Sequence, residues 1–240
     1  MKASQNIILI TGGATGIGFG LAERFIKESN TVIICGRRES VLNEASKKIP
    51  SLISRICDLS VPREREDLFK WISEEHNDLN ILVNNAGIQQ GISITDDDFL
   101  MRTKDEIAIN VEAPIHLASL FIRLKSLRTI INVTSGLAFA PIARMPVYCA
   151  SKAFMHSYTL SLRHLVKASG IEVIELIPPA LNTDLGGKGR HNDAPPVNAF
   201  VEAVFEQLKQ GKTTISFGFS EGMAKAGPDD LQRAFDRMNK

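Results

Sequence analysis

Residues 6–18 read NIILITGGATGIG, an apolar run followed by a turn rich in glycine. The apolar run predicts a buried strand, and the residues after the turn predict a helix. Gly12 permits the tight turn, Gly16 lets backbone N–H groups approach a pyrophosphate, and Gly18 lets the helix pack closely on the strand. A glycine-rich turn alone would also fit a plain chain reversal. Its place between the first strand and a helix N-terminus favours a nucleotide-binding site.

The rest of the chain alternates short apolar runs with longer amphipathic stretches. We expect strands at Asn6–Thr11, Thr31–Gly36, Leu52–Cys57, Asn80–Asn84, Thr129–Thr134, Glu172–Ile177 and Thr213–Phe217. We expect helices at about 16–29, 39–48, 62–76, 98–124, 147–168, 196–210 and 228–238. This alternation predicts an α/β fold with a doubly wound Rossmann-type parallel sheet of about seven strands and helices on both faces. No linker rich in proline and serine divides the chain, so we expect residues 1–240 to form one domain.

Composition excludes several classes of protein. Hydrophobic residues make up 44% of the 240 residues, which is too many for a disordered chain. Lys and Arg number 28 against 27 Asp and Glu, so the chain lacks the basic excess typical of a nucleic-acid binder. Neither the five histidines nor the cysteines at positions 35, 57 and 149 have a metal-ligand spacing. Without a signal peptide or an apolar run of roughly 20 residues, we expect a cytoplasmic protein with no membrane partner.

Tyr148 and Lys152 form a second informative pattern, because residues four apart share one face of a helix. Reduction of a carbonyl group needs a proton donor, and the reverse reaction needs a base. A free tyrosine, with a pKa of about 10, is a poor base at neutral pH, and a nearby cation lowers that pKa. Taken alone, the pair also fits a tyrosine that packs in the core and a solvated lysine.

Several motifs in one order resemble those of the short-chain dehydrogenase/reductase family. They are Thr11-Gly12-x-x-x-Gly16-Ile17-Gly18, Asn84-Asn85-Ala86-Gly87, Asn110, Ser135 and the pair Tyr148-x-x-x-Lys152. Together these motifs span about residues 6–185, and their joint order is more specific than any one of them. The stretch Ile177–Gly187 and the ending at 235–239 further resemble the DltE-like bacterial oxidoreductases.

The resemblance implies hydride transfer between a nicotinamide dinucleotide and an alcohol or carbonyl compound. It makes Tyr148 the general acid/base, and it makes Lys152 the group that lowers the tyrosine pKa and bonds the nicotinamide ribose. Ser135 would donate a hydrogen bond to the substrate oxygen, where charge develops. Asn110 would hold a water molecule that links Lys152 to solvent.

The resemblance also implies a set of cofactor contacts. These are Gly12, Thr15, Gly16, Ile17, Gly18, Arg37, Arg38, Asp58, Leu59, Asn85, Ala86, Gly87, Tyr148, Lys152, Pro178 and Thr183. Asp58 would meet the adenine amino group, although a helix-capping or turn-forming aspartate explains it nearly as well. Thr183 would lie near the nicotinamide carboxamide. Pro179 stands where the family usually has glycine, and proline fixes φ and removes an N–H donor just before Thr183.

The end of the second expected strand favours NADP(H) over NAD(H). NAD binders tend to place an acidic residue there, but the corresponding position is Gly36, and Arg37 and Arg38 follow. Two guanidinium groups at this point suit the 2′-phosphate of NADP. Solvated loop arginines remain an alternative, and Thr15 stands where many NADP-using relatives carry a basic residue. NAD(H) therefore stays possible.

Loops after Gly87, Ser135 and Pro178 should line the substrate pocket. The expected lining residues are Leu137, Phe139, Ile142, Met145, Val147 and Leu185, with Gln89 and Gln90 as polar contacts. Because no basic cluster is evident, we expect an uncharged alcohol or carbonyl compound as substrate. The long segment 178–196 suggests a lid.

The alternatives to an alcohol or carbonyl oxidoreductase are a non-catalytic NADP-binding redox sensor and a sugar epimerase. The resemblance also implies a homodimer or homotetramer that pairs through helices 98–124 and 147–168.

Overall fold

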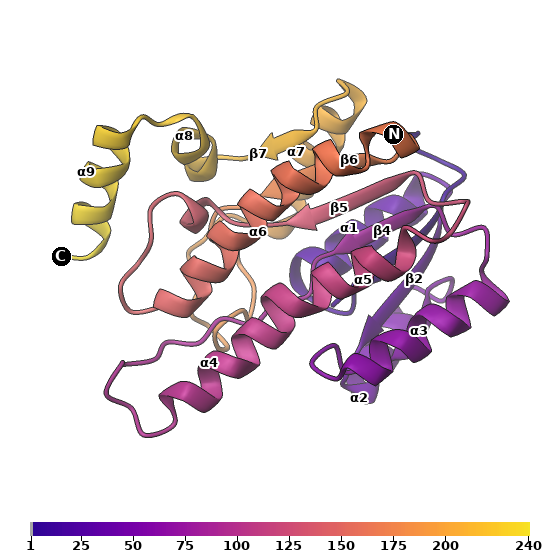
Figure 1. Ribbon diagram of the computed structural model, residues 1–240, viewed down its shortest axis with the longest axis horizontal. Helices are drawn as coiled ribbons and strands as arrows, with labels where there is room; N and C mark the ends of the chain where they lie inside the picture. The colour runs from indigo at the N-terminus through magenta and orange to yellow at the C-terminus, as the bar shows by residue number, and fades with distance from the viewer. Residues whose placement is uncertain (1) are drawn as a thin grey trace.

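Seven parallel strands form the centre of the molecule in the computed structural model, which describes residues 2–240 (Figure 1). The strand order is β3-β2-β1-β4-β5-β6-β7, with a crossover between β3 and β4. The strands are β1 Ile7–Thr11, β2 Thr31–Gly36, β3 Ile53–Ile56, β4 Ile81–Asn84, β5 Thr129–Val133, β6 Glu172–Ile177 and β7 Thr214–Ser216. The predicted doubly wound parallel sheet is therefore confirmed.

Helices cover both faces of this sheet. The main helices are α1 Gly16–Lys27, α2 Glu39–Lys48, α3 Pro62–Glu75, α4 Phe99–Ile107, α5 Ala113–Phe121, α6 Pro146–Leu165, α7 Val197–Lys209, α8 Phe219–Lys225 and α9 Pro228–Met238. Helices α1, α2 and α7 pack on one face, and α3, α5 and α6 pack on the other. Both faces of strand β1 are covered by a hydrophobic core, which explains why its sequence is apolar throughout. Ile8 and Ile10 belong to the first core and Leu9 to the second, since successive strand residues point to opposite faces.

The long helix predicted at 98–124 is interrupted in the structure. A π-helical turn at Ala108–Glu112 separates α4 from α5, and α5 ends at Phe121. In a regular α-helix, the N–H of residue 114 would bond to the carbonyl group of Asn110, but Pro114 has no N–H. Turns of this kind are frequent at functional sites, and Asn110 lies inside this one.

The C-terminal part departs further from the sequence prediction. Helix α8 was not predicted, and it is too short for a clear amphipathic period. In Figure 1, β5 and β7 point toward the side of the molecule on which α8 and α9 lie. The C-terminal helices therefore stand at the carboxyl edge of the sheet, where ligands bind in this class of fold.

None of the helices within residues 2–240 combines the length and apolar character that crossing a bilayer requires.

Candidate active site

The glycine turn after β1 has no room for larger side chains. Gly12 and Gly16 adopt φ angles of +62° and +53°, in the left-handed region that glycine tolerates best. A Cβ atom on Gly18 would lie 2.4 Å from the carbonyl oxygen of Gly12 and 2.5 Å from Nδ2 of Asn85. The close approach of α1 to the turn predicted for Gly18 is therefore present.

The N-terminus of α1 is open to an anion. Thr15 is the N-cap residue, and among residues 2–240 its side chain makes no capping hydrogen bond to the first turn. The backbone N–H groups at the start of a helix carry partial positive charge and suit a phosphate. A bare glycine turn beside such a helix end fits the pyrophosphate of a dinucleotide, so the residues present match the implied cofactor.

Hydrogen bonds fix the loop after β4 against the glycine turn. The Thr11 hydroxyl accepts hydrogen bonds from the backbone N–H groups of Asn85 and Ala86, both at 3.0 Å. Nδ2 of Asn85 donates to the carbonyl oxygen of Thr11 at 2.9 Å. The motif at 84–87 therefore holds two neighbouring strand ends together.

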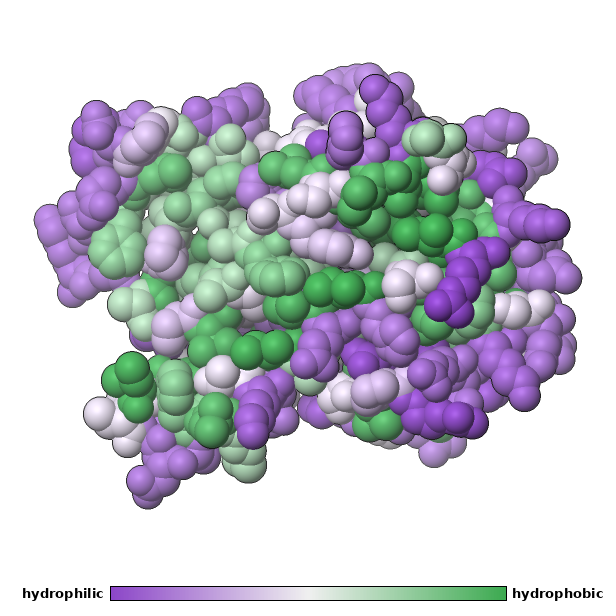
Figure 2. Space-filling view, viewed as in Figure 1, coloured by the Kyte–Doolittle hydropathy of each residue, from purple (hydrophilic) through white to green (hydrophobic). Residues whose placement is uncertain are grey.

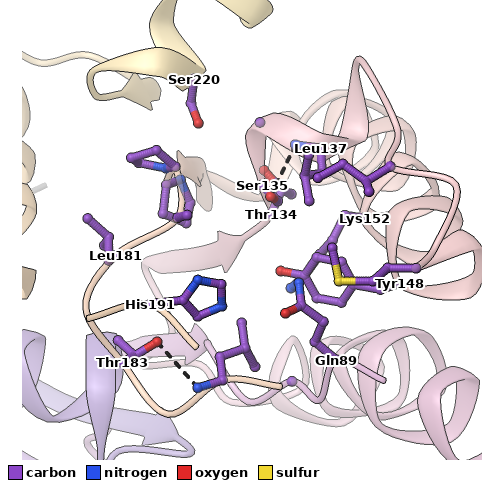
Figure 3. Close-up of a pocket in the computed structure, with 18 of the residues that line it drawn as sticks. Gln89, Thr134, Ser135, Leu137, Tyr148, Lys152, Leu181, Thr183, His191 and Ser220 are labelled. Carbon is purple, nitrogen blue, oxygen red and sulfur yellow. Dashed lines mark hydrogen bonds between the residues drawn. The ribbon is translucent and has the colours of Figure 1, made fainter. Parts of the chain in front are cut away.

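Ser135, Tyr148 and Lys152 all line one cavity of about 420 Å³. Ser135 follows β5, whereas Tyr148 and Lys152 lie in the first two turns of α6. All three are buried, with 5–6% of each residue exposed. Figure 3 shows them on one wall of the cavity, with Leu181 and Thr183 across from them. The structure therefore brings together three residues that the sequence singled out for one reaction.

Lys152 is held by the end of the sheet. Its Nζ atom donates a hydrogen bond to the carbonyl oxygen of Val133 at 2.9 Å and lies 5.7 Å from the centre of the Tyr148 ring. Burial lowers the pKa of the Lys152 ammonium group to about 8. A Cβ atom on Gly87 would lie 3.6 Å from Nζ and 3.3 Å from Oδ1 of Asn110, so these three residues meet at one point.

The pKa of Tyr148 differs from the sequence expectation. Burial raises it well above its ordinary value, and a hydrogen bond with Ser135 only partly opposes this rise. The sequence interpretation had Lys152 lowering this pKa. In the structure Lys152 is itself buried and bonded to Val133, and burial of the phenol raises the pKa of Tyr148. The raised pKa keeps the phenol of Tyr148 protonated at neutral pH.

Asn110 connects the π-helical turn to the loop after β4. Its Nδ2 atom donates to the carbonyl oxygen of Ile88 at 2.8 Å and to Oγ of Ser151 at 3.1 Å, and its Oδ1 atom accepts from the N–H of Ile88 at 2.9 Å. The side chain is thus committed to positioning this loop. The water that Asn110 was expected to hold remains a prediction.

The expected adenosine contacts lie after β2 and β3. Arg37 and Arg38 are exposed there. Oδ1 of Asp58 accepts hydrogen bonds from the N–H group of Ser60 at 2.9 Å and from its hydroxyl at 2.7 Å, which is the turn-forming role considered as an alternative. Burial raises the pKa of Asp58, but the hydrogen bonds from Ser60 and the charge of Arg37 lower it below its usual value. Arg37 therefore lies near the expected adenine contact.

The segment after β6 crosses the mouth of the site. A Cβ atom on Gly16 would lie 3.3 Å from Cγ2 of Thr183, so the segment reaches the glycine turn despite Pro179. The carbonyl oxygen of Pro178 accepts a hydrogen bond from the N–H of Gly136 at 3.1 Å. Thr183 therefore lies beside the glycine turn, and Pro178 lies beside the loop after β5.

The cavity wall differs in part from the prediction. Gln89, Leu137, Ile142, Met145 and Leu185 line it, as expected. Three other predicted residues are absent from the lining that the described residues form: Phe139, Val147 and Gln90. Phe139 packs edge-on against His156, with ring centres 4.7 Å apart, and the side chain of Gln90 bonds to Arg102.

Sequence reasoning missed several lining residues, among them Arg144, Arg190, His191, Phe219 and Met238. The last two come from the C-terminal helices. Asn239 fixes this end of the chain to the loop before α6, because its side chain accepts from the N–H of Ala143 and donates to the carbonyl oxygen of Pro141. The basic pair Arg190-His191, which lies in a glycine-rich segment, could have indicated from the sequence that this segment contributes to the cavity wall.

Comparison with known proteins identifies the family to which the residues of this site belong. The sequence model described as short chain dehydrogenase matches residues 6–194, which include every motif of the site from the glycine turn to Thr183. The chain belongs to the short-chain dehydrogenase family. An uncharacterized oxidoreductase of this type, DltE of Bacillus subtilis, is 41% identical over 253 residues, covering 100% of this chain and 98% of that protein. The predicted resemblance to DltE-like oxidoreductases is confirmed.

Solved structures show the same short-chain dehydrogenase fold. A Burkholderia cenocepacia short chain dehydrogenase in complex with NADP superposes with a TM-score of 0.84 at 21% identity and full coverage of both chains. A 3-ketoacyl-(acyl-carrier-protein) reductase from Brucella melitensis, complexed with NADH, gives 0.80 at 22% identity, covering 90% of this chain and 97% of that one. At these identities the likeness shows the fold alone.

Proposed function

We propose that this short-chain dehydrogenase is an NADP(H)-dependent oxidoreductase that interconverts an alcohol and a carbonyl compound. One observation carries the proposal: the buried side chains of Ser135, Tyr148 and Lys152 share one wall of a cavity that extends to the glycine turn. A buried tyrosine, serine and lysine have little reason to meet beside a phosphate-binding turn unless they act on a bound molecule.

Tyr148 is the general acid in the direction of reduction. Its raised pKa keeps the phenol protonated at neutral pH, so it can donate a proton to the oxygen of a carbonyl substrate. The Ser135 hydroxyl, close to the phenol, donates a second hydrogen bond to the same oxygen. In oxidation, Tyr148 has to accept a proton instead, and its raised pKa makes it a poor base at neutral pH. We therefore propose that the rate of oxidation rises with pH as the phenolate forms.

Lys152 and Asn110 support the reacting tyrosine. The Nζ atom of Lys152 stays at the end of β5 through its bond to Val133, and Asn110 holds the loop that carries Gly87 next to it. We propose that Lys152 also bonds the ribose of the cofactor. The nicotinamide group, when bound, supplies or accepts the hydride. Gly12, Gly16 and Gly18 would hold its pyrophosphate, and Thr183 would lie beside the nicotinamide carboxamide.

The cofactor preference is proposed from the end of β2. Gly36 leaves no carboxylate at the position where NAD binders tend to carry one, and Arg37 and Arg38 follow it on the surface. Exposed guanidinium groups can pair with a 2′-phosphate in a bidentate manner. Among the solved structures of this fold, one holds NADP and another NADH, so the fold alone sets no preference.

The decisive experiment is a reductase assay on a panel of aldehydes and ketones, followed at the nicotinamide absorbance with NADPH and NADH separately. We expect turnover that is faster with NADPH. The alternative of a redox sensor predicts tight NADP(H) binding without turnover on any compound. Binding without turnover by a chain that retains Tyr148 would therefore reject the proposed function.

Three broader properties are also proposed. The two cores lie on opposite faces of one sheet, which supports a single domain over residues 1–240. Free, buried cysteines at positions 35, 57 and 149 support a reducing, cytoplasmic location.

Apolar side chains gather over α4 and α6 in Figure 2, including the exposed Leu100, Met101, Ile107, Phe154, Leu160 and Leu165. Such a patch supports a homodimer or homotetramer, which light scattering can test.

A further inference from the structure

The charged groups of the cavity are all basic. Of the described residues that line it, Arg144, Lys152 and Arg190 carry a permanent or titratable positive charge, His191 adds an imidazole, and none is Asp or Glu. The rest of the wall is largely apolar, with Leu137, Ile142, Met145, Leu185, Phe219 and Met238 among its residues. A wall of this composition suits a molecule with an apolar middle and a negative charge.

The two cavity arginines belong to chain segments that approach the same loop, although they are far apart in the sequence. A Cβ atom on Gly91 would lie 3.7 Å from Nη1 of Arg190 and 3.9 Å from the carbonyl oxygen of Arg144. One arginine comes from the loop before α6 and the other from the segment after β6, and both flank the loop after β4. His191, the neighbour of Arg190, extends into the cavity between Thr183 and Gln89 in Figure 3. Arg190 therefore lies at the rim of this cavity.

Arg190 lies at the end of a path that leads away from the glycine turn. In the segment after β6, Thr183 faces Gly16, and a Cβ atom on Gly186 would lie 2.7 Å from Oε1 of Gln89. Arg190 then faces Gly91. The segment thus runs from the expected pyrophosphate site, along the loop after β4, to the outer end of the cavity. This course places the guanidinium group of Arg190 at the end of the cavity away from the glycine turn.

Neither guanidinium group is neutralised by the protein. Within residues 2–240, no carboxylate lies within ion-pair distance of Arg144 or Arg190, and their side chains donate no hydrogen bond. Arg102, on the neighbouring helix α4, shows the contrast: it pairs with Asp96 and Asp98 and bonds to Gln90. Both free arginines are exposed at the cavity mouth, where their donors are available to an anion.

We propose that the substrate carries an anionic oxygen group, a carboxylate or a phosphate, which Arg144 and Arg190 bind while the reacting carbonyl group lies against Tyr148 and Ser135. This inference deepens the proposed function and rests on it. It replaces the uncharged substrate expected from the sequence, where the two arginines stand 46 positions apart and form no visible cluster. The apolar wall between the two ends would bury a hydrocarbon or other apolar middle of the molecule.

Matched pairs of aldehydes test the charge requirement. We would compare 4-oxobutanoate and 6-oxohexanoate with their methyl esters, and glyceraldehyde 3-phosphate with glyceraldehyde, in the reductase assay with NADPH. The protein should reduce at least one anion with a kcat/KM at least 10-fold above that of its neutral partner, since charge-assisted hydrogen bonds are strong. The carboxylate and phosphate arms identify which group the site takes.

Two variants locate the effect. Arg144→Gln and Arg190→Gln should each lower kcat/KM for the preferred anion about 10-fold or more, with less than a twofold change for its neutral partner and for the Kd of NADPH measured by fluorescence. Arg123→Gln removes an exposed arginine on the chain after α5, outside the cavity, and serves as the matched control. It should behave like the wild type.

The outcomes distinguish a failure of the anionic-substrate proposal from a failure of the proposed oxidoreductase function. If neutral aldehydes are reduced as well as their anionic partners, the anionic substrate is rejected and the oxidoreductase stands. If Arg190→Gln weakens NADPH binding instead, the guanidinium belongs to the cofactor and the inference is equally rejected. If no compound is reduced with either cofactor, the proposed function itself fails.

Discussion

Nζ of Lys152 donates a hydrogen bond of 2.9 Å to the backbone carbonyl oxygen of Val133. The bond ties the second turn of α6 to the last residue of β5, just before Thr134 and Ser135. It also draws an ammonium group into an environment where only 5% of the residue is exposed. A buried cation is costly, and this cost makes the stability of the protein depend on pH.

We expect the free energy of unfolding to rise with pH between about 7.5 and 9.5 through Lys152. Its pKa is about 8 in the folded protein and 10.5 in its ordinary state, so the unfolded chain binds more protons over this range. The contribution is about 2 kcal/mol. The free energy of unfolding of the wild type and of Lys152→Met can be measured with urea at several pH values. The difference between the two proteins should change by this amount across the pH range. Lys167→Met, at an exposed lysine, should follow the wild type, and a constant difference for Lys152→Met would contradict the lowered pKa.

Tyr148→Phe should lower kcat of carbonyl reduction about 10²- to 10⁴-fold, the range typical of general acid catalysis. The ring stays in place, so thermal unfolding and NADPH binding should be nearly unchanged. Tyr158→Phe is the matched control, because Tyr158 lies on the same helix outside the cavity lining. A Tyr148→Phe enzyme with undiminished turnover would remove Tyr148 from the reaction.

Gly18→Ala should destabilise the protein by about 1–3 kcal/mol, as overpacking does. Its methyl group would lie 2.4 Å from the carbonyl oxygen of Gly12, so the turn has to shift and the Kd of NADPH should rise at least about 10-fold with it. Gly222→Ala is the control, since its Cβ atom meets nothing within 4 Å in α8 and alanine favours a helix. We expect it to raise the unfolding temperature slightly and to leave the Kd unchanged, and equal effects of both variants would argue against the close packing of Gly18.

The sequence predicted the fold well because the strands are buried on both faces. Ile8, Leu9 and Ile10 are each fully buried, which explains an apolar run without alternation, and the predicted strand ends differ from the observed ones by at most one residue. The break between α4 and α5 was missed because the pattern of apolar residues continues through it. Pro114 was the visible sign, but a proline near a helix start would read in the same way.

The candidate site was predictable where its residues are close in sequence or share a motif, as Tyr148 and Lys152 do. The basic end of the cavity was not, because the segments that carry Arg144 and Arg190 come together only through the packing of two loops around Gly91. The pKa of Tyr148 was also beyond sequence reasoning, since spacing places a lysine nearby but does not reveal how deeply both groups are buried. Proximity and desolvation act in opposite directions, and only coordinates show which is larger.

Arg37→Gln and Arg38→Gln should reduce the preference for NADPH over NADH. Both side chains are exposed after β2, and neither position offers a carboxylate to the ribose. Loss of a charge-assisted hydrogen bond to the 2′-phosphate should raise the KM for NADPH about 10-fold for the more important arginine, with less than a twofold change for NADH. Arg37 lies close enough to lower the pKa of Asp58, so we expect its variant to show the larger effect.

The ionic strength of the assay gives this prediction a second readout. Contacts between exposed guanidinium groups and a phosphate weaken as salt is added, so the KM for NADPH of the wild type should rise with salt more steeply than that for NADH. Arg37→Gln should flatten this dependence, whereas Arg63→Gln, at an exposed arginine on α3, should retain it. Equal salt dependence for both cofactors in the wild type would mean that neither arginine meets the 2′-phosphate, and the preference for NADPH would then lose its physical basis.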